Sequence, residues 1–192
     1  ADMDMAIDGA IFAAFLHAGQ VCESGTRLFP PEKISSDFIN ELVRRTEKIK
    51  VGYQLSPDIT MGPVINGERL KKITEYIETG EKEGANLLTG GRQVQLKGFE
   101  KGNYLLPTIF TNVSPEMTIA TEEIFGPVLA ISTYKNESEL IELANSTRYG
   151  LAAGIWSQNF VRAEELTRQL RAGTVWINDW HIFHEFGPFG GY

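Results

Sequence analysis

The chain has 192 residues, 42% of them hydrophobic and 22% charged, so it can bury at least one sizeable core. Its net charge is −7 and no run of lysine or arginine stands out, which argues against a nucleic-acid or anionic-membrane surface. No apolar run has the length of a membrane-spanning helix, no signal peptide is recognisable at the start, and a single cysteine rules out an internal disulfide, so we expect a cytoplasmic protein.

The sequence of the first half of the chain predicts three helices. Residues 3–16 are rich in Ala, Ile, Leu and Phe, which is typical of a buried helix. Apolar residues then recur at three- and four-residue spacing up to Ile49, and Ser35 or Ser36 is the expected cap of that helix. An amphipathic helix is expected over residues 68–83.

The second half alternates between extended and helical patterns. Strands are expected over residues 85–89, 104–113, 128–134, 151–157 and 174–178, and helices over 137–145 and 160–170. A strand–helix–strand–helix–strand order from residue 128 onward is typical of parallel pairing. The predicted fold is α/β, with a mostly parallel sheet covered by helices on both faces. Ligands of such sheets gather beyond the carboxyl ends of the strands, so the segment after Asn178 is a candidate binding wall.

Cys22 is the first candidate for chemistry. It follows the apolar helix and lies between Gly19 and Gly25, where the backbone can turn sharply and another group can approach closely. A lone cysteine is commonly a small buried hydrophobe. The polar residues around Cys22 instead favour a thiol that is accessible to a small molecule. A thiolate is a good nucleophile toward a carbonyl carbon. The direction of the nearby Arg27 cannot be read from the sequence.

Residues 121–128 (TEEIFGPV) are the second candidate, because two adjacent acids enter a Phe-Gly-Pro turn. They can be a solvated face. Alternatively, one carboxylate accepts hydrogen bonds from sugar hydroxyls while Phe125 packs against a flat ring, and only one of Glu122 and Glu123 can point that way.

The third candidate is the aromatic segment that follows the last expected strand. Its aromatic residues read as a substrate funnel or a subunit contact, or as ring faces that hold a cation; they are Trp180, Phe183, Phe186 and Phe189. His181 and His184 lack a second pair of ligands, so no metal site is expected. Glycine-rich nucleotide fingerprints, phosphate loops and serine-hydrolase or zinc-protease motifs are absent.

Four segments in series resemble the aldehyde dehydrogenase superfamily over essentially the whole chain. Residues 17–27 (HAGQVCESGTR) resemble its nucleophile segment, and residues 122–128 resemble its cofactor-ribose motif. Residues 145–154 resemble a third recurrent stretch, and residues 173–178 with 188–192 resemble the closing one.

The resemblance implies a role for each matching residue. Cys22 would attack an aldehyde to give a thiohemiacetal and then a thioester, with its own backbone N–H helping to hold the oxyanion. Glu123 would bind the nicotinamide ribose of NAD or NADP, of which NAD is the commoner cofactor, and Phe125 would lie beside it. Phe183 and Phe189 would line the substrate tunnel, with Trp180 joining them. The implied partner is a small-molecule aldehyde, and the full-length protein would be a homodimer or homotetramer.

The family's remaining catalytic parts have no counterpart in the sequence. These are the glutamate general base of a Glu-Leu-Gly-Gly motif, the cofactor-binding lysine, the amide that completes the oxyanion hole and the strand that bridges subunits. The resemblance therefore implies one catalytic domain over residues 1–192, with the dinucleotide-binding domain and the oligomerisation strand outside this chain, and an inactive fragment. Two alternatives stay open, a CoA-acylating semialdehyde dehydrogenase and a non-catalytic relative with a structural or binding role.

Overall fold

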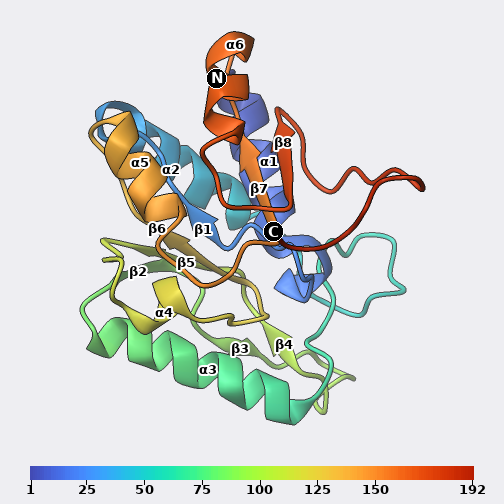
Figure 1. The fold of residues 1–192 in the computed structure, drawn as a ribbon. Helices are drawn as coiled ribbons and strands as arrows, with labels where there is room; N and C mark the ends of the chain where they lie inside the picture. The colour runs from blue at the N-terminus through green and yellow to red at the C-terminus, as the bar shows by residue number, and fades with distance from the viewer.

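The computed structural model describes residues 1–192 and is built on a central four-stranded sheet (Figure 1). The strand order is β1-β6-β5-β2, formed by Arg27–Leu28, Val128–Ile131, Thr108–Thr111 and Asn86–Thr89. The β1–β6 and β5–β6 pairs are parallel, and β2 joins the edge of β5 in the antiparallel sense. The predicted mostly parallel α/β architecture is therefore confirmed.

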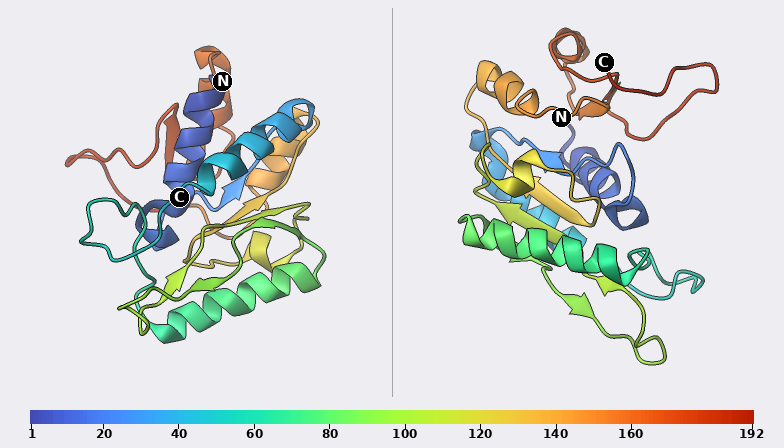
Figure 2. Two further views of the ribbon diagram at one scale, coloured as in Figure 1. Left: turned by 180° about the vertical axis from the view of Figure 1, so that it is seen from behind. Right: turned by 60° about the horizontal axis from the view of Figure 1, so that its bottom comes forward.

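Helices cover both faces of this sheet, as predicted, because the strand residues alternate between two cores. Ile109, Leu129 and Ile131 pack with α1 (Met3–Phe15) and α2 (Glu32–Thr46). Phe110, Val128 and Ala130 point the other way, toward α3 (Gly67–Lys82) and α4 (Thr118–Thr121). Figures 1 and 2 show α3 on one side of the sheet and α1 and α2 on the other.

A second, separate pair of parallel strands corrects one detail of the prediction. β7 (Ala152–Ile155) pairs with β8 (Thr174–Ile177), and α5 (Glu137–Ala144) and α6 (Phe160–Thr167) occupy the predicted connections. However, β6 pairs with β1 and β5 and not with β7. The alternation of strands and helices correctly predicts parallel pairing, but it contains no signal for which strands share a sheet.

Helix starts depend on local capping. α2 begins at Glu32 directly after Pro30 and Pro31, so the expectation that Ser35 or Ser36 caps this helix is wrong. Proline fixes φ at a value suited to entering a helix and has no N–H to leave unpaired, so the helix starts one turn earlier. α3, α5 and α6 each begin after an asparagine whose side chain accepts a hydrogen bond from the backbone.

The remaining elements are short. They are a 3₁₀ turn over Leu16–Gly19 and a two-stranded antiparallel sheet of β3 (Gln93–Val94) and β4 (Tyr104–Leu105). After β8 the chain runs outward as a long loop and then turns back toward the body of the molecule (Figure 1). None of the helices is both long and apolar enough to cross a membrane.

Candidate active site

The cysteine turn is held by the helix that precedes it. After α1 the backbone enters the left-handed region, with φ of 66° at Gly19. The Ser24 hydroxyl and the Gly25 N–H both donate to the carbonyl of Ala13, each at 3.0 Å. These bonds fold residues 20–25 back on α1 and leave the Cys22 side chain exposed. The thiol is therefore on the surface of an anchored turn and not in the core.

The backbone around Cys22 leaves one donor free. The N–H of Ser24 closes the turn by donating to Val21 at 3.0 Å, whereas the N–H of Cys22 has no acceptor in the protein. A free N–H beside a thiol is suited to receive the negative oxygen formed when sulfur adds to a carbonyl. Arg27 does not serve the thiol, because its guanidinium donates to Leu143 at 2.6 Å and to the Ser146 hydroxyl at 2.9 Å. Burial there lowers the pKa of Arg27.

The Phe-Gly-Pro motif lies directly against the cysteine turn. A Cβ placed on Gly19 would be 2.2 Å from the carbonyl oxygen of Gly126, so the two backbones touch and only glycine fits. This contact joins two segments that are more than a hundred residues apart in the sequence. Gly19 lies shortly before Cys22, and Gly126 directly follows Phe125.

The structure separates the roles of the two adjacent acids. Glu122 accepts a hydrogen bond from the Tyr76 hydroxyl at 2.8 Å, and burial together with that bond raises the pKa of Tyr76. Glu123 is exposed, and its carboxylate has no hydrogen-bond partner. Of the two exposed acids, Glu123 is therefore the one whose carboxylate is unpaired.

Glu123 and Phe125 line one open, shallow hollow of about 420 Å³. Its other lining residues come from the start of α3 and the loop before it, and they are Ile65, Asn66, Glu68, Arg69 and Lys72. A free carboxylate, an aromatic ring and two cations in one hollow can bind a ligand that carries hydroxyls and a flat ring.

The aromatic segment forms a continuous cluster with the second sheet. Trp180 stacks on Trp156 at 6.2 Å between ring centroids and lies 5.1 Å from Trp176. Phe183 packs edge-on against Trp176 at 5.6 Å, and Phe189 packs edge-on against Phe183 at 5.3 Å. Phe183 and Phe189 are about half exposed, at 46% and 57%, so their rings remain available to a ligand.

This cluster contacts two residues that follow Cys22 on the same turn. Glu23 is only 7% exposed, and its carboxylate is in hydrogen-bond contact with Nδ1 of His181. The ring of Trp180 lies 3.3 Å from the position that a Cβ on Gly25 would take. The segment that carries the predicted tunnel residues thus lies against the turn that carries the predicted nucleophile. No group of three His, Cys, Asp or Glu side chains is placed to hold a metal ion.

Sequence reasoning missed three contributors to this site. Tyr149, in the third resembling stretch, accepts a hydrogen bond from the Glu123 N–H at 3.3 Å. Arg69 donates to the loop that carries Phe125, and His181 pairs with Glu23. The seven-residue spacing of Arg69 and Tyr76 places them on the same face of α3, and this could have been predicted from the sequence. No local sequence pattern predicts the contact between His181 and Glu23.

Known proteins resemble this chain in sequence and in fold. The aldehyde dehydrogenase family matches residues 1–192. Betaine aldehyde dehydrogenases of Bacillus subtilis and Brucella anthropi are each 44% identical over 192 residues, which is all of this chain and 39% of either relative. A crystal structure of betaine aldehyde dehydrogenase from Staphylococcus aureus in complex with NAD⁺ has a TM-score of 0.97 at 38% identity, covering 100% of this chain and 38% of that one. The chain thus spans well under half the length of these relatives, and it belongs to the aldehyde dehydrogenase family.

Proposed function

We propose that residues 1–192 are the nucleophile-bearing catalytic domain of an NAD(P)⁺-dependent aldehyde dehydrogenase that oxidises an aldehyde to a carboxylic acid. The observation that carries this is the placement of the single thiol, which is exposed on a turn that touches the Phe-Gly-Pro motif at Gly19 and the aromatic cluster at Glu23 and Gly25. The dinucleotide-binding domain and the strand that bridges subunits would belong to the full-length protein, a cytoplasmic homodimer or homotetramer.

Cys22 supplies the nucleophile in this scheme. Its thiolate forms a C–S bond to the aldehyde carbon while the carbonyl electron pair moves onto oxygen, which the free N–H of Cys22 stabilises. Bound NAD(P)⁺ supplies the acceptor for a hydride. Cys22 then carries the acyl group as a thioester until water releases the acid and restores the thiol.

The hollow lined by Glu123 and Phe125 is suited to the ribose end of such a cofactor. Ribose hydroxyls are donors, and the unpaired, exposed Glu123 carboxylate is an acceptor for them. Phe125 offers a ring in the same hollow. NAD⁺ is favoured over NADP⁺, in keeping with the NAD⁺ bound by the Staphylococcus aureus protein.

The same protein's name points to an aldehyde that carries a quaternary ammonium group. The rings of Trp180, Phe183 and Phe189 are suited to such a group, because a cation is attracted to the face of an aromatic ring. The test compares betaine aldehyde with 3,3-dimethylbutanal, its neutral isostere. We expect the full-length protein to prefer the cation in kcat/KM by about 10-fold, and Trp180→Leu to reduce that preference. Equal kcat/KM values would contradict this substrate class.

The nucleophile is tested by alkylation of the full-length protein. Iodoacetamide should label Cys22 stoichiometrically and abolish NADH production, and prior addition of aldehyde should slow the labelling. Cys22→Ser should lower kcat by at least about 100-fold without changing the unfolding temperature. An unlabelled thiol, or a fully active Cys22→Ser variant, would favour a non-catalytic relative.

Product analysis separates the two enzymatic possibilities. A hydrolytic enzyme releases the free acid whether or not CoA is present. A CoA-acylating enzyme releases acyl-CoA and stalls without CoA. We expect the free acid.

A further inference from the structure

Two side chains on one face of α3 form hydrogen bonds to the loop that carries Glu123 and Phe125. Arg69 and Tyr76 are seven residues apart, two helical turns, so they lie on the same side of the helix. The Arg69 guanidinium donates to the carbonyls of Ile124 and Phe125, the latter at 3.4 Å, while Tyr76 holds Glu122. Loop 122–125 is therefore anchored at three of its four residues from this one helix.

The loop needs such an anchor because of its conformation. Phe125 has φ of 53°, a left-handed value that is unfavourable for a residue with a side chain and persists only where the surroundings impose it. Arg69 acts on both sides of that residue through the two carbonyls, and its guanidinium carbon lies 5.6 Å from the centre of the Phe125 ring. The planar guanidinium fork makes these contacts from two separate nitrogens, whereas lysine has one compact ammonium with neither the fork nor the planar face.

We propose that Arg69 is a positioning residue, which fixes the Ile124–Phe125 peptide so that Glu123 and Phe125 face the cofactor hollow before any ligand arrives. The inference rests on the proposed function, because the ligand concerned is the cofactor. It assigns to Arg69 an action through the loop backbone and not a contact with the reacting atoms.

The test uses Arg69→Gln and Arg69→Lys in the full-length protein. The matched control is Lys71→Gln, on the same helix, whose side chain is 80% exposed and 3.9 Å from Glu75. We expect both Arg69 variants to bind NAD⁺ about 10-fold more weakly, since each loses bonds from a charged donor. Amide hydrogens of residues 122–126 should exchange faster in the ligand-free variants. The rate of Cys22 alkylation should not change in the Arg69 variants. The control Lys71→Gln should bind NAD⁺ as the parent does.

Each contrary result is informative. Unchanged NAD⁺ affinity and unchanged exchange in Arg69→Gln would overturn the inference. So would a slowed Cys22 alkylation together with a lowered unfolding temperature, because Arg69 would then be merely structural. If the Arg69 variants do not fold, Tyr76→Phe tests the same face of α3. We expect this variant to bind NAD⁺ about threefold more weakly. Unchanged binding by Tyr76→Phe would contradict the inference. A parent protein that binds no NAD⁺ would overturn the proposed function itself, and this inference with it.

Discussion

At the residue scale, the contact between Glu23 and His181 decides how the aromatic segment is held beside the nucleophile. The Glu23 carboxylate is nearly inaccessible, and His181 is its only hydrogen-bond partner. A buried carboxylate without a donor loses its hydration and gains nothing in return. The pair therefore acts as a tether between the cysteine turn and the segment that contains Phe183.

Removing this tether should destabilise the protein. His181→Ala leaves the Glu23 carboxylate buried and unpaired, so the free energy of unfolding in urea should fall by about 1–3 kcal/mol. His184→Ala is the control, because His184 is exposed and its side chain makes no hydrogen bond. Equal effects of the two substitutions would show that Glu23 does not depend on its partner.

At the element scale, the junction between the cysteine turn and the Phe-Gly-Pro loop depends on Gly19. Gly19→Ala combines an unfavourable left-handed φ with a clash against the Gly126 carbonyl. Gly98→Ala provides the comparison, because Gly98 has φ of 85° and would meet no atom within 4 Å. The left-handed conformation should cost about 1–2 kcal/mol in both variants. Only Gly19→Ala should lose more than that and also change the rate of Cys22 alkylation, and indistinguishable variants would argue against the junction.

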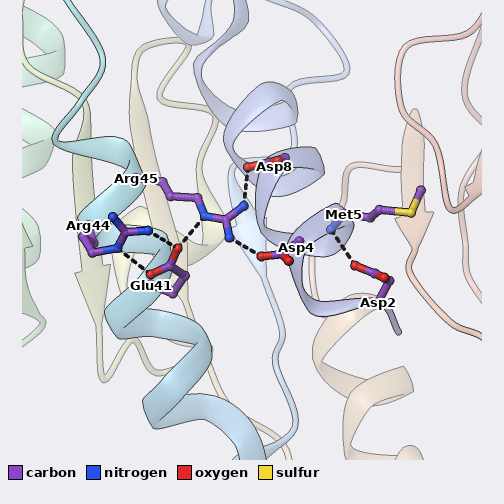
Figure 3. A network of polar contacts seen from close by, with 7 residues as sticks. All are labelled: Asp2, Asp4, Met5, Asp8, Glu41, Arg44 and Arg45. Atoms are coloured by element: carbon purple, nitrogen blue, oxygen red, sulfur yellow. Dashed lines mark hydrogen bonds and ion pairs between the residues drawn. The ribbon is translucent and has the colours of Figure 1, made fainter.

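A network of charges joins α1 to α2 on the outside of the molecule (Figure 3). Arg45 on α2 reaches Asp4 and Asp8 on α1, and it also binds Glu41, which Arg44 binds in turn. Hydrogen bonds from Arg44 and Arg45 lower the pKa of Glu41 from 4.5 to about 2. These side chains are screened by water, so the network contributes modestly to stability.

This network predicts a pH dependence of known sign. Because the pKa of Glu41 is lower in the folded state, its contribution is fully present above the unfolded pKa of about 4.5 and is lost as the pH falls toward about 2. Glu41→Gln should therefore have a lower unfolding temperature than the parent at pH 6, and the difference should shrink steadily as the pH falls from about 4.5 toward about 2. High salt should reduce the difference at pH 6. A difference that does not vary between pH 6 and pH 2 would contradict the assignment.

At the scale of the whole molecule, α1 connects the two parts that form the site. Ile7, Ala10 and Ala14 pack into the core of the central sheet. Gly9, on another side of the helix, lies against the ring of Trp156, which directly follows β7. One helix thus sets the position of the central sheet, of the aromatic cluster and of the Cys22 turn at its own end.

Most of this architecture is predictable from local patterns, and the site is predictable only in pieces. Periodicity and capping identify long elements such as α3 within one or two residues. Two-residue strands such as β1 have no period to detect, and their existence depends on a partner far away in the chain. Cys22 stands out by residue type and flanking glycines, and the two acids stand out by the Phe-Gly-Pro turn that follows them. The choice between Glu122 and Glu123, however, depends on Tyr76, which only the packing of α3 brings near.

The last prediction concerns whether these 192 residues can oxidise an aldehyde without the rest of the protein. The hollow at Glu123 and Phe125 is open and offers a cofactor few contacts, and the carboxylate nearest to Cys22 in sequence is held by His181 and is not free to act as a base for hydrolysis. We therefore expect the purified chain to be alkylated at Cys22 but to produce no NADH from aldehyde and NAD⁺. The full-length protein is the positive control, and circular dichroism checks that the chain is folded. NADH production by the chain at the rate of the full-length protein would show that residues 1–192 already contain the base and a sufficient cofactor site.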